Sequence, residues 1–91
     1  MMTITFDPAK REEALRLRGL DFRRASDVFD GAYTSAPDDR FDYGETRIIS
    51  AGFLDGRMVV IVWTPRGEDR HIISMRYCHA KEEKRWRQRM D

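Results

Sequence analysis

The sequence predicts a single α+β domain, spanning residues 1–91, in which two helices pack on one face of a largely antiparallel sheet. Three observations support this prediction. The chain length suits one domain. The hydrophobic content of 41% is enough for a core, although 36% of the residues are charged. Helical spacing of apolar residues near the N-terminus gives way to short apolar runs between turn formers, which predicts the order β-α-α-β-β-β-β-α.

The N-terminal third predicts one strand and two helices. Residues 2–6 alternate in polarity, as a short strand does. A first helix is predicted over residues 8–18, because Asp7 can cap its free N–H groups and Gly19 can end it in the left-handed conformation. A second helix is predicted over residues 21–30, where apolar side chains recur at helical spacing.

The rest of the chain predicts four strands and a closing helix. The Asp55-Gly56 pair lies between two apolar runs and indicates a hairpin. The second of these runs, residues 58–64, is apolar on both faces and is expected to be a central strand. The closing helix is predicted over residues 78–90. The other three strands are predicted over residues 32–36, 46–53 and 70–77, with loops over residues 37–44 and 65–69.

The last strand carries positive charge close to the core. Strict alternation gives it two faces, one of which must meet the helices, and the sequence does not decide which one, although one face is the more apolar. That face would consist of His71, Ile73, Met75 and Tyr77. If that face meets the helices, Arg70 and Arg76 lie on a partly open face, and Arg66 in the preceding loop adds a third guanidinium. Such groups match phosphate and stay charged at cellular pH, but they also form structural ion pairs with carboxylates.

The distribution of charge predicts a basic C-terminal helix and an acidic loop. The formal net charge of +1 does not by itself indicate a nucleic-acid partner. Residues 76–89 hold six basic and two acidic side chains, whereas residues 38–45 hold four acidic and one basic. The basic helix is either a solvated surface or, through Lys81, Arg85 and Trp86, a contact for a nucleic-acid backbone.

Proton transfer has few candidates in this sequence. His71 and His79 are the two histidines, and a histidine exchanges protons near neutral pH. The spacing of His, Cys and carboxylate residues does not match a metal site. The sequence contains none of the common nucleotide-binding or hydrolase motifs, so no cofactor is expected. The single cysteine, Cys78, suits a reducing compartment, and no apolar run is long enough to span a membrane, so a cytoplasmic location is expected.

Several short segments, in order, resemble the BrnT toxins, which are the RNA-cleaving partners of BrnA antitoxins in bacterial type II toxin–antitoxin systems. The matching segments are FDPAK at residues 6–10, RGLDF at 18–22, TPR at 64–66 and IISMR at 72–76, followed by Glu82 and Trp86. The resemblance implies a RelE-like fold with a basic C-terminal helix. It also implies metal-independent endoribonucleolytic cleavage of messenger RNA, which inhibits translation and growth.

The resemblance further implies partners and site residues. The partners would be an RNA substrate and a BrnA-type antitoxin, two toxins with two antitoxins, with DNA contacted only through the antitoxin and no membrane contact. By motif, the catalytic positions would be Lys10, Arg66, Arg70, His71, Arg76 and Glu82, while Lys81 and Arg85 would bind RNA. His71 or Glu82 would transfer protons, and the cationic side chains would surround the phosphorus centre.

Two other classes of function remain open at this point. Ala14 and Arg18 stand where the family usually has an asparagine and a histidine, so a RelE-like module that binds RNA or protein without cutting is the alternative. A DNA-binding regulator is a third hypothesis, because residues 8–30 form two consecutive predicted helices.

Overall fold

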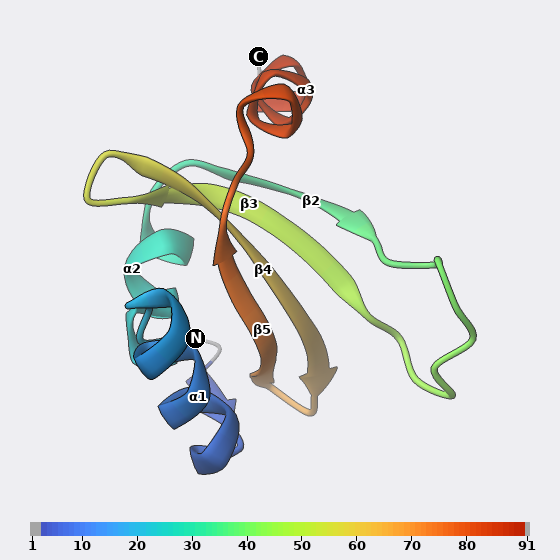
Figure 1. The fold of residues 1–91 in the computed structure, drawn as a ribbon. Coiled ribbons are helices and arrows are strands. Elements are labelled where there is room, and N and C mark those ends of the chain that lie inside the picture. Colours follow the sequence, from blue (N-terminus) through green and yellow to red (C-terminus); the bar gives the residue numbers. More distant parts are fainter. Residues whose placement is uncertain (1–2, 91) are drawn as a thin grey trace.

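The computed structural model describes residues 3–90 and has a mixed α+β fold, as predicted (Figure 1). The element order also agrees, except that the second predicted helix begins as a short 3₁₀ helix. The elements are β1 (Thr3–Phe6), α1 (Pro8–Arg18), η1 (Phe22–Arg24), α2 (Ala25–Asp30), β2 (Tyr33–Pro37), β3 (Ile48–Leu54), β4 (Arg57–Arg66), β5 (Asp69–Tyr77) and α3 (Ala80–Met90).

The five strands form one sheet in the order β1-β5-β4-β3-β2. Three of the four strand pairs are antiparallel, and only β1 runs parallel to its neighbour β5. The predicted central position of the apolar run is confirmed, because β4 is flanked by β3 and β5. Its residues between Met58 and Trp63 are buried, apart from the half-buried Val62.

The predicted signals at the ends of α1 are confirmed. The side chain of Asp7 accepts a hydrogen bond from the Ala9 backbone N–H at 2.9 Å, which caps the helix. Gly19 ends it with φ of 68° and ψ of 20°, a left-handed conformation that glycine adopts without steric cost. Asp21 caps η1 in the same way, by accepting from the Arg23 backbone N–H.

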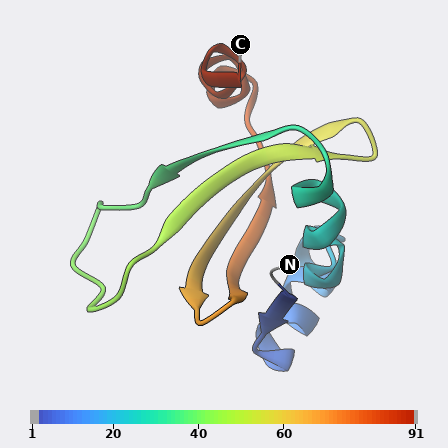
Figure 2. The same ribbon diagram turned by 180° about the vertical axis from the view of Figure 1, so that it is seen from behind.

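The helices divide between the ends of the sheet. Helices α1 and α2 lie together beside one face, whereas α3 lies apart from them, past the end of β5 (Figures 1 and 2). The main core forms where α1 and α2 meet the sheet, and Phe22, Val28, Ile61, Ile72 and Met75 are almost completely buried in it. Helix α3 buries none of its own residues. No helix among residues 3–90 is long and apolar enough to cross a membrane.

A β-bulge in β5 overturns the predicted faces of this strand. Val62 pairs with Ser74, but the next residue, Trp63, pairs with Ile72, so Ile73 is an extra residue on β5. Ile72 and Met75 therefore both face the core and are 0% exposed, although strict alternation put them on opposite faces.

The bulge also changes where the charged side chains point. Arg70 shares the core-facing side with Ile72, whereas His71 and Arg76 lie on the opposite face. The interpretation in which His71 faces the helices, and Arg70 and Arg76 share an open face, is therefore wrong.

Two segment boundaries also differ from the sequence prediction. Arg66 was expected in a loop, but it is the last residue of β4 and pairs with Asp69. The ladder continues through Pro65 because the two strands are joined only by the short Gly67-Glu68 turn, in which Gly67 has φ of 60°. The loop between β2 and β3 is longer than predicted and covers residues 38–47.

Candidate functional site

An open hollow of about 400 Å³ lies at one end of the sheet, and we call it the basic hollow. It combines three of the residues that the sequence singled out, namely Lys10 from α1, Arg66 from β4 and His71 from β5. The complete lining is Asp7, Lys10, Glu45, Arg47, Arg66, His71, Ile72 and Ile73.

The topology explains why residues so far apart in sequence meet here. The β4–β5 turn, the first turn of α1 and the loop over residues 38–47 all reach the same end of the molecule (Figures 1 and 2). The parallel pairing of β1 with β5 places Thr5 beside His71, and α1 starts directly after β1. Lys10 is therefore carried next to β5 by the strand that precedes its helix.

The imidazole of His71 is held in place and favours its neutral form. Its Nδ1 lies 2.9 Å from Thr5 Oγ1, a hydrogen bond whose direction depends on the tautomer. Burial lowers the pKa of His71 below its ordinary value of 6.5, and the nearby charge of Arg66 and then of Lys10 lowers it further, while Glu45 and Asp7 oppose the shift. A neutral imidazole at pH 7 can accept a proton.

Two of the cations in the hollow have no ion-pair partner among residues 3–90. Neither Lys10 nor Arg66 forms an ion pair with another residue in the described range 3–90. Arg47 is partly neutralised, since its Nε lies 3.3 Å from a carboxylate oxygen of Glu45. The carboxylate of Asp7 accepts a hydrogen bond from the first turn of α1. The arrangement can therefore hold an anion such as a phosphate next to a proton acceptor.

Arg70 lies outside the basic hollow, on the core-facing side of the sheet. Its guanidinium carbon is 4.0 Å from the ring centroid of Phe29 and 5.1 Å from that of Trp63. Its Nη2 donates to the hydroxyl of Tyr33 at 3.2 Å, whereas its buried Nε has no hydrogen-bond partner within the described structure. Cation–π stacking of this kind fixes the first half of β5 against α2.

Arg76 and Glu82 form a structural ion pair at the other end of β5. Two guanidinium nitrogens of Arg76 donate to the two oxygens of Glu82 at 2.8 and 2.7 Å. The same carboxylate accepts from the thiol of Cys78 at 3.3 Å and from the backbone N–H of His79 at 3.4 Å, which caps α3. Arg76 is the main reason that the pKa of Glu82 falls from 4.5 to about 2, so this carboxylate is a poor proton acceptor near neutral pH.

The same cluster contains the thiol of Cys78, which donates a hydrogen bond to Glu82. Cys78 is half-buried, and burial, followed by its hydrogen bond to Glu82, raises the pKa of its thiol to about 12. The thiolate form that a nucleophile needs is therefore scarce at neutral pH.

The two residues proposed for RNA contact lie on α3, apart from the basic hollow. Arg85 lines a separate shallow depression together with Glu82, Trp86 and Arg89, and Lys81 is exposed on the first turn of the helix. Arg89 also donates to the Ser35 carbonyl at 3.0 Å, which ties α3 to the edge strand β2. Lys81 and Arg85 are thus separated from the basic hollow.

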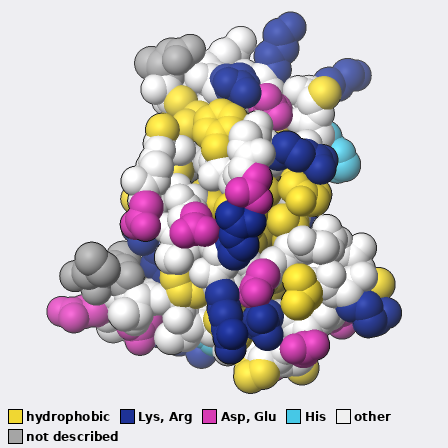
Figure 3. Space-filling model, turned by 90° about the vertical axis from the view of Figure 1, so that its left-hand side faces the viewer, with side chains coloured by type: hydrophobic (Ala, Val, Ile, Leu, Met, Phe, Trp, Pro, Cys, Tyr) yellow, Lys and Arg dark blue, Asp and Glu magenta, His cyan; other side chains and the backbone are white. Residues whose placement is uncertain are grey.

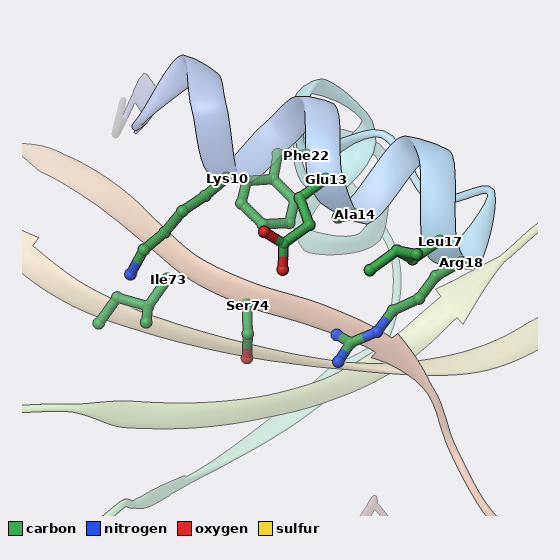
Figure 4. A pocket seen from close by; sticks show the side chains of 8 residues that line it. All are labelled: Lys10, Glu13, Ala14, Leu17, Arg18, Phe22, Ile73 and Ser74. Atoms are coloured by element: carbon green, nitrogen blue, oxygen red, sulfur yellow. The ribbon is translucent and has the colours of Figure 1, made fainter.

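A second hollow lies between α1 and β5 (Figure 4), and its lining includes more apolar side chains than that of the basic hollow. Lys10 and Arg18 both extend from α1 toward β5, with Glu13 between them (Figure 4). Arg18 donates to the Met75 carbonyl at 3.1 Å, which protects the free edge of β5 beyond the end of β1. Basic and acidic side chains also lie next to one another on the left-hand side of the molecule (Figure 3), unlike a continuous basic surface.

Sequence reasoning missed three residues of the basic hollow and its support. Glu45 and Arg47 belong to the long loop. This loop is far from the other site residues in the sequence, so no local pattern connected Glu45 and Arg47 to the site. Thr5 belongs to the first predicted strand, and its place opposite His71 depends on the parallel register of β1 and β5, which the sequence alone does not show. In the described range 3–90, no three His, Cys, Asp or Glu side chains cluster as metal ligands do.

Comparison with known proteins gives one positive result. A family model described as "Ribonuclease toxin, BrnT, of type II toxin-antitoxin system" matches residues 6–82, which include every residue of the basic hollow. The comparison with curated proteins finds no match.

Proposed function

The chain belongs to the BrnT family of ribonuclease toxins of type II toxin–antitoxin systems, and we propose that it cleaves messenger RNA in the basic hollow without a metal ion. The observation that carries this proposal is the convergence of Lys10, Arg66 and His71 from three elements on one hollow. The family supplies the reaction class, whereas the contacts and charges in the chain suggest which residues perform it.

The chemistry starts from the 2′-hydroxyl of the RNA itself. His71 Nε2 accepts the proton of this hydroxyl, while Nδ1–H donates to Thr5 Oγ1 and holds the ring. The 2′-oxygen attacks the adjacent phosphorus, the bond from phosphorus to the 5′-oxygen breaks, and that oxygen takes up a proton from solvent. The products are a 2′,3′-cyclic phosphate and a 5′-hydroxyl.

The cations of the hollow have a separate role in this reaction. Negative charge builds on the non-bridging phosphate oxygens as the 2′-oxygen attacks. Lys10 and Arg66 have no ion-pair partner in the described range, so their charge is free to stabilise those oxygens. Arg66 can do so with two parallel hydrogen bonds, which lysine cannot.

Arg70, Arg76 and Glu82 have supporting roles in this proposal. Arg70 is stacked among aromatic rings on the far face, and the Arg76–Glu82 pair connects β5 to α3. Glu82 already accepts hydrogen bonds from three residues, which opposes a role in proton transfer.

The experiment is incubation of the purified protein with single-stranded RNA in excess EDTA. Cleavage that leaves a 2′,3′-cyclic phosphate is expected. Such a 3′ end resists 3′ end-labelling both before and after phosphatase treatment, and becomes labelled only after acid has opened the ring and phosphatase has removed the resulting monoester. A requirement for added magnesium would contradict the mechanism. Binding of RNA without cleavage under any of these conditions would instead favour a non-catalytic RNA-binding module.

A type II toxin–antitoxin family implies an antitoxin protein as partner. In this proposal the partner is of the BrnA type, two toxins join two antitoxins in the cytoplasm, and only the antitoxin contacts DNA. The RelE-like character of the fold is part of the same proposal, since it rests on the order of helices and strands and on the basic α3. Light scattering of the co-purified complex tests the stoichiometry.

A further inference from the structure

The loop over residues 38–47, which forms part of the basic hollow, also carries an exposed aromatic ring. Glu45 and Arg47 of this loop form one wall of the hollow. Phe41, four residues before Glu45, is 70% exposed, the largest exposure among the large hydrophobic side chains of the described structure. Exposing an aromatic ring to water is unfavourable, so an exposed ring on a loop that lines a cationic site is a candidate contact for a ligand.

A continuous set of contacts links this ring to the hollow. The rings of Phe41 and Tyr43 meet edge to face, with centroids 5.8 Å apart. The guanidinium carbon of Arg47 lies 3.9 Å from the centroid of the Tyr43 ring. Arg47 in turn lines the hollow with Arg66 and His71. The aromatic pair is therefore an extension of the same site.

The loop that presents these rings is held at its base by Asp38. The carboxylate of Asp38 is fully buried and accepts two hydrogen bonds from Arg40, at 2.7 and 2.9 Å, and one from the Tyr43 hydroxyl at 3.3 Å. Its backbone N–H donates to the Arg47 carbonyl at 2.8 Å, which closes the loop. A ring on a pre-organised loop loses little conformational freedom when it binds.

We propose that Phe41, supported by Tyr43, is a stacking subsite for one nucleobase of single-stranded RNA whose neighbouring phosphodiester lies in the basic hollow. This inference rests on the proposed function and adds a substrate requirement to it. Unpaired bases stack on exposed aromatic rings, whereas the bases of a duplex are already stacked on each other.

The charges around the ring agree with a base as the ligand. Arg40, which precedes Phe41, is paired with the buried carboxylate of Asp38, whereas the exposed Asp42 follows Phe41 and the exposed Asp39 lies two residues before it. The two exposed carboxylates repel phosphate, while the uncharged face of a base can still approach the ring. The phosphate is instead attracted to Lys10 and Arg66 in the hollow. In this arrangement the loop contacts the base, and the hollow contacts the phosphate.

The test measures binding and cleavage separately. A fluorescein-labelled RNA hexamer with 2′-O-methyl groups lacks the nucleophile, so its fluorescence anisotropy reports binding alone. The variants are Phe41→Ala, Phe41→Trp, which retains an aromatic ring, and Leu17→Ala as a matched control. Leu17 is 62% exposed on α1 and does not line the basic hollow. Cleavage of unmodified RNA by each variant is measured in parallel.

Phe41→Ala is expected to weaken hexamer binding about 5- to 30-fold, the low end of what one base–aromatic stack contributes. Phe41→Trp and Leu17→Ala are expected to bind within about twofold of the unaltered protein, because neither loses a stacking ring. A duplex of the same sequence is expected to compete poorly.

Two results would overturn the inference, namely unchanged binding by Phe41→Ala or an equal loss in Leu17→Ala. If Phe41→Ala leaves RNA binding unchanged and weakens neutralisation by the antitoxin, the ring is a protein contact instead. The proposed function fails differently, through absence of cleavage in the unaltered protein while Phe41→Ala still weakens binding of the hexamer.

Discussion

The two ends of β5 carry similar residues but use them differently. At its first half, His71 lies with Arg66 and Lys10 around an open hollow, and neither cation has an ion-pair partner in the described range. At its last half, Arg76 is joined to Glu82 through two hydrogen bonds, and that carboxylate also caps α3. One end leaves charge available to a ligand, and the other end uses its charge to hold the fold.

This comparison teaches that residue type and strand position do not decide what an arginine does. Arg66, Arg70 and Arg76 were all candidates for phosphate binding in the sequence, yet one faces a hollow, one stacks on aromatic rings, and one pairs with a carboxylate. The partner within reach makes the difference. A guanidinium bonded to a carboxylate has little charge left for a phosphate, because the two opposite charges cancel at a distance.

The largest expected effect concerns the histidine at the open end. Replacing His71 with Ala should lower the cleavage rate about 100- to 10,000-fold, because a general base contributes a factor of that size. The rate constant on a short RNA under single-turnover conditions is the measurement, with circular dichroism to establish that the fold is retained. A loss below tenfold would show that His71 is not the general base, and the reaction would then have to be assigned to another part of the molecule.

The next effect concerns the free cation of the hollow. Arg66→Ala should slow cleavage about 10- to 100-fold, less than a buried oxyanion donor would, because the hollow is open to solvent. Arg66→Lys keeps the charge but loses the fork and should recover only part of the rate. If Arg76→Ala proved as damaging as Arg66→Ala in a variant with a native melting temperature, the contrast between the two ends would be wrong.

At the closed end, a change should affect stability rather than chemistry. Glu82→Gln removes a charge-assisted pair with Arg76 and should lower the free energy of unfolding by about 1–2 kcal/mol, since partial exposure weakens the pair. The folded-state pKa of Glu82, about 2, lies below its ordinary value of 4.5. The stabilisation is therefore present above pH 4.5 and is lost as the pH falls toward 2.

Urea unfolding of the unaltered protein and of Glu82→Gln at pH 7 and pH 3 checks this prediction. The stability difference should be larger at pH 7 than at pH 3. The cleavage rate of the folded variant should stay close to that of the unaltered protein, and a rate loss comparable to that of a His71 variant would instead assign Glu82 to the chemistry.

The smallest expected effect concerns the support of the histidine. Thr5→Val removes the hydroxyl bonded to His71 Nδ1 and should reduce the rate about threefold to tenfold, because the ring loses its fixed tautomer. The protonated imidazole also loses an acceptor, so the pKa of His71, already below 6.5, should fall further. The acidic limb of the pH–rate profile should then move to lower pH, and Thr5→Ser should restore it.

Much of the fold was predictable because its signals are local. Asp7 and Gly19 mark the ends of α1, and Asp55-Gly56 marks the β3–β4 hairpin, each within a few residues of the feature it creates. The bulge at Ile73 was not predictable in this way. It depends on how β5 packs against β4 and on which side chains fill the core, and no residue near it is a typical bulge signal.

The sequence by itself determined the order and type of the main helices and strands, the central place of β4 and the resemblance to the family. Only the tertiary structure decided which charged residues meet. Lys10, Arg47, Arg66 and His71 come from four separate segments, and their convergence depends on the parallel pairing of β1 with β5 and on the course of the long loop. The physical reason is range: caps and turns act between near neighbours, whereas electrostatic partners are chosen by distance in space after the strands have paired.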